Sequence, residues 1–190
     1  FCGRVLPGHE LAIRDSEGND LPDRVIGRVH IRGPSVMNGY FGDPAATKRV
    51  LSKTGWLDTG DMGYTVDGEL VITGRGKDLI ICNGRNIWPQ DIEWAVEGLH
   101  GLRRGDAAAF SVEDEAGAEQ VVVVVQCRLT QAEEREQLER EISAATRLVA
   151  GADCRVVLAQ PRSLPLTSSG KLSRTSAKAN YLAGRYDPSK

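Results

Sequence analysis

The stretch 74–93 reads GRGKDLIICNGRNIWPQDIE, and its pattern divides the chain into two parts. It begins with a glycine-flanked basic turn, continues through a short apolar strand expected over 78–82, and reaches a second glycine turn. A helix is expected to begin at Pro89, because proline is favoured at the first helical position, and to end at Glu97. The stretch predicts a domain boundary near 74–77, and we interpret it as a hinge followed by a swinging loop.

Short strands joined by glycine turns fill the chain before this boundary. Alternation of apolar and polar residues predicts half-buried strands at Glu10–Arg14 and 28–32. Asp43 before Pro44 is a helix N-cap signal. Val66-Asp67-Gly68 is a hairpin turn signal, and a strand is expected over 69–73. So many short strands predict a small β-rich, barrel-like or sandwich subdomain.

After the boundary, strands alternate with helices. Strands are expected over 107–112, 121–126 and 155–158, and the five consecutive valines from Val121 predict a buried central strand. Thr130 to Glu133 reads as a capping box that opens a helix to about Val149. The apolar stripe expected on this helix consists of Leu138, Ile142, Ala145 and Val149. A loop is expected over 164–169 and a final helix over 172–182. The fold class is therefore α+β, with a small mixed sheet flanked by helices.

Composition excludes several classes of protein. Hydrophobic residues make up 41% and charged residues 26%, which is typical of a globular chain. The net charge of -2 argues against a nucleic-acid partner, and we interpret the acid-rich run 133–141 as a solvated helix face. The four cysteines form no CxxC pair and lie near no histidine, which favours a reducing, cytoplasmic setting without a metal site. No apolar run is long enough for stable membrane insertion, and no signal peptide is visible.

Three short motifs could carry chemistry, although each is weak by itself. Thr59-Gly60-Asp61 can present a carboxylate to a vicinal diol, but an aspartate beside glycine is usually only a turn residue. Arg75 and Lys77 form a basic turn that could reach phosphate or ribose oxygens, or simply be solvated. Lys171 follows a Ser/Gly loop that is not a phosphate loop of the Walker type, because Pro165 stands where a glycine is needed and Leu172 follows the lysine.

The order and spacing of these motifs are more specific than any one of them. GWLDTGD, then the stretch 74–93, then PLTSSGKLSR resembles the C-terminal third of the adenylate-forming superfamily, which includes acyl-CoA synthetases, fatty acyl-AMP ligases, luciferases and peptide-synthetase adenylation domains. GRVHIRGPSVMNGYFGDP is similar to a further family segment, with Arg28 in place of the usual glutamate. GRNIWPQDIE and DAAAFSV are most similar to the fatty acyl-AMP ligases, with Trp88 where tyrosine is frequent and Cys82-Asn83 where bulkier residues are common.

The resemblance implies roles for particular residues. Asp61 and Arg75 would bind the ribose of ATP, Lys77 would be the pivot, and Lys171 would be the catalytic lysine of adenylation. The loop with Gly84 and Arg85 would shape the pantetheine tunnel for the thioester step. The cofactors implied are ATP and Mg²⁺, whose ligands are expected upstream, together with the phosphate-binding loop and the acyl pocket.

The resemblance also implies a domain organisation and a function. Residues 1–74 would be the β-rich end of a large adenylation domain, and 75–190 a mobile α+β domain with its hinge near 75–78. Since the chain begins abruptly at Phe1, we expect a fragment. Because the phosphate-binding loop and the acyl pocket would lie upstream, we expect this fragment to be inactive alone. The whole enzyme would activate a fatty acid with ATP and pass the acyl group to the phosphopantetheine of an acyl carrier protein. An acyl-CoA synthetase and a non-catalytic carrier-docking module remain the alternatives.

Overall fold

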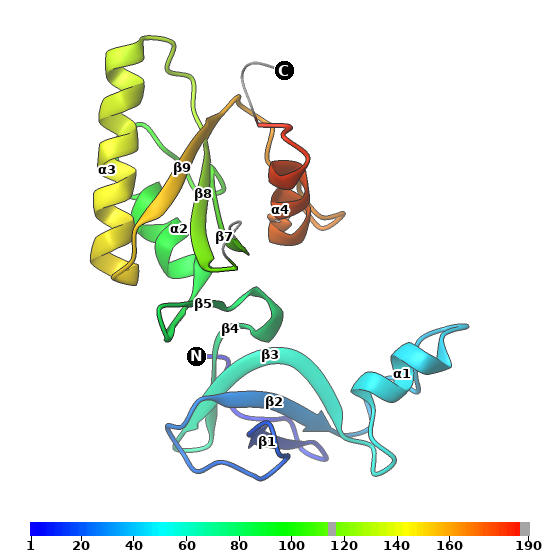
Figure 1. Cartoon of the computed structure of the whole chain (residues 1–190). Coiled ribbons are helices and arrows are strands. Elements are labelled where there is room, and N and C mark those ends of the chain that lie inside the picture. Colours follow the sequence, from blue (N-terminus) through cyan, green and yellow to red (C-terminus); the bar gives the residue numbers. More distant parts are fainter. Residues whose placement is uncertain (114–116, 187–190) are drawn as a thin grey trace. The chain divides into compact units, whose positions relative to one another are not determined.

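A computed structural model describes residues 1–113 and 117–186 of the chain (Figure 1). The chain divides into two compact units, Phe1–Lys77 and Asp78–Lys190, which are described separately below. The first unit is dominated by one antiparallel sheet, and the second combines a small mixed sheet with helices on both faces. The predicted α+β class is confirmed.

The sheet of the first unit is a meander in the order β1-β2-β3-β4. Its strands are β1 (Glu10–Arg14), β2 (Gly27–Arg32), β3 (Leu57–Val66) and β4 (Glu69–Arg75). β1 and β4 lie at the two edges, so the predicted β-rich subdomain takes the form of an open sheet. Ile13 and Val29 are buried and stand opposite each other on β1 and β2, as the alternating pattern predicted.

Two local predictions in the first unit are confirmed. Helix α1 (Pro44–Val50) begins after Asp43, whose Oδ1 accepts a hydrogen bond from the Ala46 N–H at 2.7 Å. The β3–β4 hairpin turns at Asp67 and Gly68, whose φ angles are 52° and 80°. Positive φ at both central residues is the type I′ geometry, which matches the twist of the strands it joins.

Gly63 on β3 predicts a measurable stability effect. The residue is buried, and a Cβ atom built there would overlap the backbone carbonyl oxygen of Val71 on β4. Because a hydrogen-bonded strand cannot move its carbonyl aside, Gly63→Ala should lower the free energy of unfolding by about 1–3 kcal/mol. Urea denaturation of the chain checks this. The control is Gly76→Ala, where the added Cβ would meet Met62 side-chain atoms at 3.5 Å and the Gly60 carbonyl oxygen at 3.7 Å, both ordinary van der Waals distances. Equal midpoints for the two variants would contradict the prediction.

The second unit opens with the hairpin β5 (Ile80–Cys82) and β6 (Arg85–Ile87), followed by α2 (Pro89–Glu97). Next come β7 (Ala107–Glu113), β8 (Glu119–Gln126), α3 (Ala132–Ala150), β9 (Cys154–Ala159) and α4 (Arg174–Leu182). The sheet order is β7-β8-β9, with β7 antiparallel and β9 parallel to β8. The parallel pairing requires a crossover, which α3 supplies.

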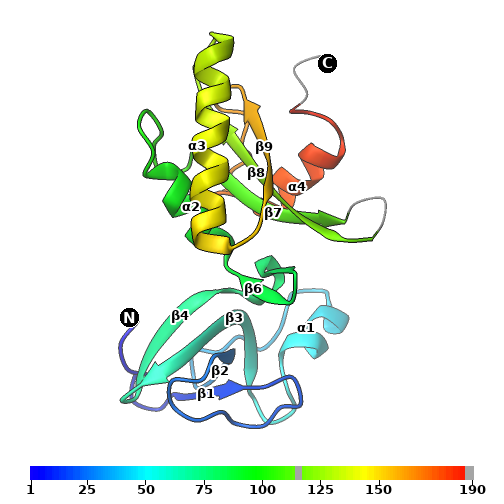
Figure 2. The ribbon, with the colours of Figure 1, turned by 60° about the vertical axis from the view of Figure 1, so that its left-hand side comes forward.

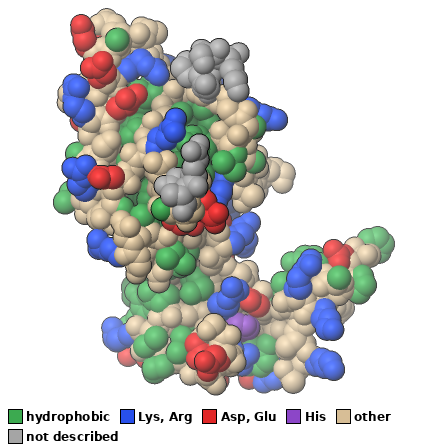
Figure 3. All heavy atoms as spheres, in the orientation of Figure 1, with side chains coloured by type: hydrophobic (Ala, Val, Ile, Leu, Met, Phe, Trp, Pro, Cys, Tyr) green, Lys and Arg blue, Asp and Glu red, His purple; other side chains and the backbone are tan. Residues whose placement is uncertain are grey.

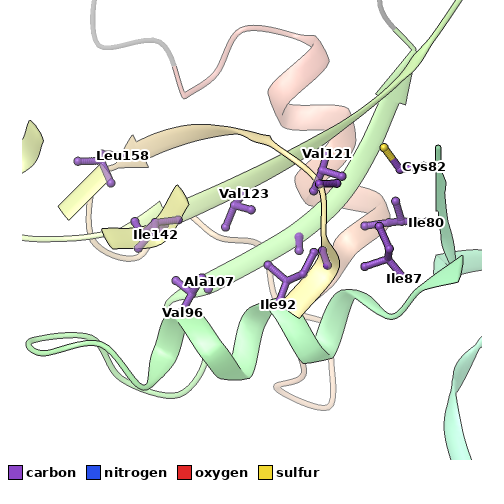
Figure 4. Close-up of a cluster of buried hydrophobic side chains, with 14 of the residues drawn as sticks. Ile80, Cys82, Ile87, Ile92, Val96, Ala107, Val121, Val123, Ile142 and Leu158 are labelled. Atoms are coloured by element: carbon purple, nitrogen blue, oxygen red, sulfur yellow. The ribbon is translucent and has the colours of Figure 1, made fainter. Parts of the chain in front are cut away.

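Strand β8 is buried on both faces because helices cover both sides of the sheet. α2 and α3 lie on one side and α4 on the other (Figures 1 and 2). Val121, Val123 and Val125 belong to the core beside α2 and α3, whereas Val122 and Val124 pack with Ala177 of α4. Figure 4 shows the first of these cores, where Ile92 and Val96 of α2 and Ile142 of α3 meet the strand residues. The predicted buried central strand is confirmed.

The start of α3 differs from the prediction. Gln131 is the N-cap and makes no side-chain capping bond, so the capping box predicted from Thr130 to Glu133 is wrong. Since the helix begins at Ala132, Thr130 lies one residue too far upstream to cap its first turn.

The buried face of α3 also departs from the predicted stripe. The buried residues of α3 are Leu138, Ile142, Thr146 and Ala150, each four positions after the one before. Val149, which was predicted to be buried, is 41% exposed. Contacts spaced by four residues drift around the helix by about 40° per step, which lets α3 follow the twisted sheet.

Two further elements begin later than expected. The residues Gly76–Asp78 form a 3₁₀ turn, so β5 starts at Ile80 rather than at residue 78. Leu172 pairs with Leu166 in an isolated bridge, so α4 starts at Arg174 rather than at residue 172. The four cysteines are all unpaired, and none of the helices in the described residues is long and apolar enough to cross a membrane.

Candidate functional site

Thr59-Gly60-Asp61 lies inside β3, where the pairing with β2 is irregular. Gly60 has φ 75° and its N–H donates to Asp58 Oδ1 at 2.9 Å, while the Thr59 hydroxyl donates to the Val29 carbonyl at 2.9 Å. The Asp61 N–H donates to Thr59 Oγ1 at 3.1 Å. A left-handed glycine of this kind makes a bulge that re-aims the next side chain. The motif is therefore a β-bulge stabilised by three hydrogen bonds, and the bulge orients the side chain of Asp61.

Asp61 and Arg75 stand opposite each other on β3 and β4. Arg75 Nε donates to Asp61 Oδ1 at 2.9 Å, with the two side chains 53% and 31% exposed. In the described part of the chain, Oδ2 of Asp61 has no hydrogen-bond partner, so one carboxylate oxygen stays available to an external donor. The pair thus offers a carboxylate acceptor beside guanidinium donors at the end of one hairpin, which suits a polar ligand carrying hydroxyl groups.

Lys77 is the last residue of the first unit and lies in the 3₁₀ turn after Arg75. Its side chain is exposed. A single 3₁₀ turn carries few backbone hydrogen bonds, so rotation at this point would break little regular structure.

Lys171 lies at the closing end of a tight hairpin rather than on an extended loop. Leu166 pairs with Leu172, and the Thr167 N–H donates to the Lys171 carbonyl at 2.7 Å. Two more bonds close the turn: Gly170 N–H to the Thr167 carbonyl at 2.9 Å, and Lys171 N–H to Thr167 Oγ1 at 3.1 Å. The backbone of Lys171 is therefore held in place, while its side chain is exposed and can extend toward an anion.

Gly84 and Arg85 lie in the β5–β6 hairpin, whose turn residues Asn83 and Gly84 have φ of 51° and 71°. The strands on either side carry buried apolar residues that join the core of the second unit. The Arg85 guanidinium lies against Gly151, the left-handed C-cap of α3, where a Cβ atom would overlap its nitrogen. A cation at a helix C-terminus is favourable. The apolar residues Ile80, Cys82 and Ile87 pack into the core, so this hairpin belongs to the body of the second unit.

The second unit also contains three charged residues that bind one another, Asp78, Glu93 and Arg174, which we call the charged cluster. Arg174 donates from Nε and Nη2 to the two carboxylate oxygens of Glu93 at 2.7 and 2.6 Å, and from Nη1 to Asp78 Oδ2 at 3.1 Å. Glu93 is 5% exposed and also accepts the Ala109 N–H of β7 at 3.0 Å. These hydrogen bonds, to Glu93 first, raise the pKa of Arg174, so the guanidinium stays charged at every working pH.

The structure brings Asp61 and Arg75 together in the first unit and places Lys171, Gly84 and Arg85 in the second. Glu93 and Arg174 were not singled out from the sequence, although both fall inside the quoted motifs. A glutamate on the buried face of a predicted helix was the available signal, because such a charge requires a partner.

Metal-binding and strongly basic surfaces were also considered. Within residues 1–113 and 117–186, no group of three or more His, Cys, Asp or Glu side chains could hold a metal ion. Basic and acidic side chains are interspersed on the face shown in Figure 3.

Comparison with known proteins adds sequence and fold relatives. The family model described as "AMP-binding enzyme" matches residues 1–41. A putative acyl-CoA synthetase of Caulobacter vibrioides is 51% identical over 97% of this chain. A structure from a study of fatty acyl-adenylate ligases from E. coli and L. pneumophila matches 97% of the chain with a TM-score of 0.86 and 43% identity. The McyG A-PCP structure with phenylalanyl-adenylate matches 97% with a TM-score of 0.87 and 33% identity.

The chain spans only part of each of these proteins. It covers 32% of the Caulobacter protein and 32% and 29% of the two solved chains. The similarity nevertheless runs through both units of this chain, because each of the three matches covers nearly all of it.

Proposed function

Because this chain belongs to the adenylate-forming superfamily, we propose that it is the C-terminal part of a fatty acyl-AMP ligase. The whole enzyme joins a fatty acid to the AMP moiety of ATP and then passes the acyl group to the phosphopantetheine thiol of an acyl carrier protein. The observation that carries this choice of branch is the segment GRNIWPQDIE, residues 84–93, which is most similar to the fatty acyl-AMP ligases. The 43% identity to the structure from the study of fatty acyl-adenylate ligases, over 97% of the chain, supports it.

In this proposal Asp61 and Arg75 hold the ribose of ATP. The free Oδ2 of Asp61 accepts a ribose hydroxyl, and the Arg75 guanidinium, fixed by its bond to Oδ1, adds a donor beside it. The left-handed Gly60 and the Thr59 hydroxyl keep the carboxylate in place before ATP arrives, so little ordering remains to be done on binding.

Lys171 acts in the adenylation step. A carboxylate oxygen of the fatty acid attacks the α-phosphorus of ATP, and the bond from that phosphorus to the bridging oxygen breaks as pyrophosphate leaves. Two anions must approach, and negative charge grows on the oxygens around phosphorus. The Lys171 ammonium placed between them offsets the repulsion and stabilises that charge. An ammonium is a compact point charge with less demanding geometry than a guanidinium.

The thioester step needs a different face of the second unit. We propose that rotation about Lys77 withdraws Lys171 and brings in the hairpin with Gly84 and Arg85, which then lines the path of the pantetheine arm. Since that hairpin and the Lys171 hairpin both belong to the second unit, one rotation would move both.

Mg²⁺ would screen the phosphate charges of bound ATP when present. We assign its ligands to the upstream part of the enzyme, together with the phosphate-binding loop that the resemblance places there.

The second candidate is an acyl-CoA synthetase, which is favoured by the 51% identity to the putative acyl-CoA synthetase of Caulobacter vibrioides. The two candidates differ in the acceptor thiol. We expect the intact enzyme, given laurate and ATP, to accumulate acyl-AMP when free CoA is added and to form thioester only with a phosphopantetheinylated carrier protein. Mass spectrometry of both products checks this, and rapid formation of lauroyl-CoA would establish the second candidate instead.

A third candidate is a non-catalytic module that only docks a carrier protein. The organised Asp61–Arg75 pair and the closed Lys171 hairpin argue against it, because docking alone uses neither.

A further inference from the structure

The charged cluster joins the start of the second unit, at the proposed hinge, to the start of α4, which follows the Lys171 hairpin. Asp78 is the first residue of the unit, and Arg174 is the first residue of α4, 96 positions later. Glu93 of α2 lies between them and binds Arg174 with both carboxylate oxygens. One guanidinium therefore ties the start of the unit, a helix on one face of the sheet and the helix on the other face.

The side chains of this cluster are less exposed to water than those of a surface ion pair, so their geometry is more tightly fixed. The Glu93, Asp78 and Arg174 side chains are 7%, 13% and 22% exposed, so water competes little for their hydrogen bonds. Glu93 also accepts the backbone N–H of Ala109, which fixes the carboxylate to β7. Planar, two-pronged binding of a carboxylate by arginine restricts both distance and angle.

The backbone between Arg174 and Lys171 is held just as closely. Ser173 caps α4 by accepting the Ser176 N–H, and the Ser173 N–H donates to the Pro165 carbonyl at 2.9 Å. The Lys171 hairpin is closed immediately before it by the Leu166–Leu172 bridge. Once the Arg174 side chain is fixed, the position of the Lys171 backbone follows with little freedom.

We propose that Asp78, Glu93 and Arg174 are positioning residues for Lys171, which make the start of the second unit and the Lys171 hairpin move as one body. A change of backbone angles at Lys77 is passed to Asp78, through Arg174 to the base of the hairpin, and so to the lysine ammonium. This inference rests on the proposed function, because it assigns the cluster a purpose in placing Lys171 for adenylation.

The test uses Arg174→Lys and Asp78→Ala in the intact enzyme. Lysine at 174 keeps the charge that Glu93 needs but loses the two-pronged grip, and Asp78→Ala leaves the Arg174–Glu93 pair untouched. Each should lower kcat for adenylation, measured as ATP–pyrophosphate exchange, by about tenfold to a hundredfold, because small misplacement of a catalytic group is costly. KM for ATP should stay nearly constant, and so should the rate of thioester formation from supplied acyl-AMP.

The decisive comparison adds Lys171→Ala to each variant. If the cluster acts through Lys171, then Arg174→Lys should lower adenylation no further in an enzyme that already lacks the lysine. Arg147→Lys is the matched control. Arg147 pairs with the exposed Asp153, away from the charged cluster, so this variant should leave both half-reactions unchanged.

Two results would overturn the inference while leaving the proposed function intact. One is an equal loss in both half-reactions for Arg174→Lys and Asp78→Ala, which would mark a merely structural role. The other is a full further loss when either is combined with Lys171→Ala. The proposed function is tested separately, by Lys171→Ala alone. If that variant leaves adenylation unchanged, the proposed function fails.

Discussion

Lys171→Ala in the intact enzyme is expected to lower the rate of adenylation by about a hundredfold or more, because one electrostatic contact to the transition state is worth on the order of 3 kcal/mol. Thioester formation from supplied acyl-AMP should be largely spared, since the lysine is proposed to be withdrawn in that step. Single-turnover measurement of each half-reaction checks both statements.

The control for this prediction is Lys178→Ala, a change of the same type on α4 that lies outside the hairpin. It should leave both half-reactions unchanged. The assigned role of Lys171 is wrong if both half-reactions survive its loss, and a carrier-docking module would then regain support.

Arg174→Leu in the isolated chain is expected to lower the free energy of unfolding by about 3–5 kcal/mol, because it leaves the buried Glu93 carboxylate without its charge partner. Arg147→Leu removes an exposed ion pair and should change the free energy of unfolding by about 0–1 kcal/mol. Urea denaturation of both variants, followed by circular dichroism, provides the comparison.

A double variant identifies the cause of that loss. Glu93→Met combined with Arg174→Met removes both charges, so it should be more stable than Arg174→Met alone, although the Ala109 N–H then lacks its acceptor. If the double variant is as unstable as the sum of its single changes, the loss arises from packing and not from an unpaired charge.

Local signals allowed much of the fold to be predicted. The Asp43-Pro44 start of α1 and the Asp67-Gly68 turn depend on residues close in sequence, and both are confirmed. The five valines from Val121 also predicted their own burial, because a strand with no polar face must be covered on both sides.

The failures are those in which distant residues decide. The buried row of α3 includes Thr146 rather than Val149 because the twisted sheet, and not the hydropathy of the helix, selects the contacts. The Glu93–Arg174 pair joins residues 81 positions apart, and no pattern within either helix names the partner. The roles of Asp61, Arg75, Lys77 and Lys171 remain predictions from the resemblance, now with defined local geometry.

The two-sided burial of β8 has a consequence for synthesis on the ribosome. Chains fold from the N-terminus as they emerge, and α4, which covers Val122, Val124 and Phe110, is translated after every strand of its sheet. Until α4 is translated, one apolar face of the valine-rich sheet is exposed to water, and Glu93 lacks its guanidinium partner. When α4 is translated, it covers the exposed face of the sheet, and its Arg174 pairs with Glu93. Folding of α4 should therefore lower the risk of aggregation during synthesis.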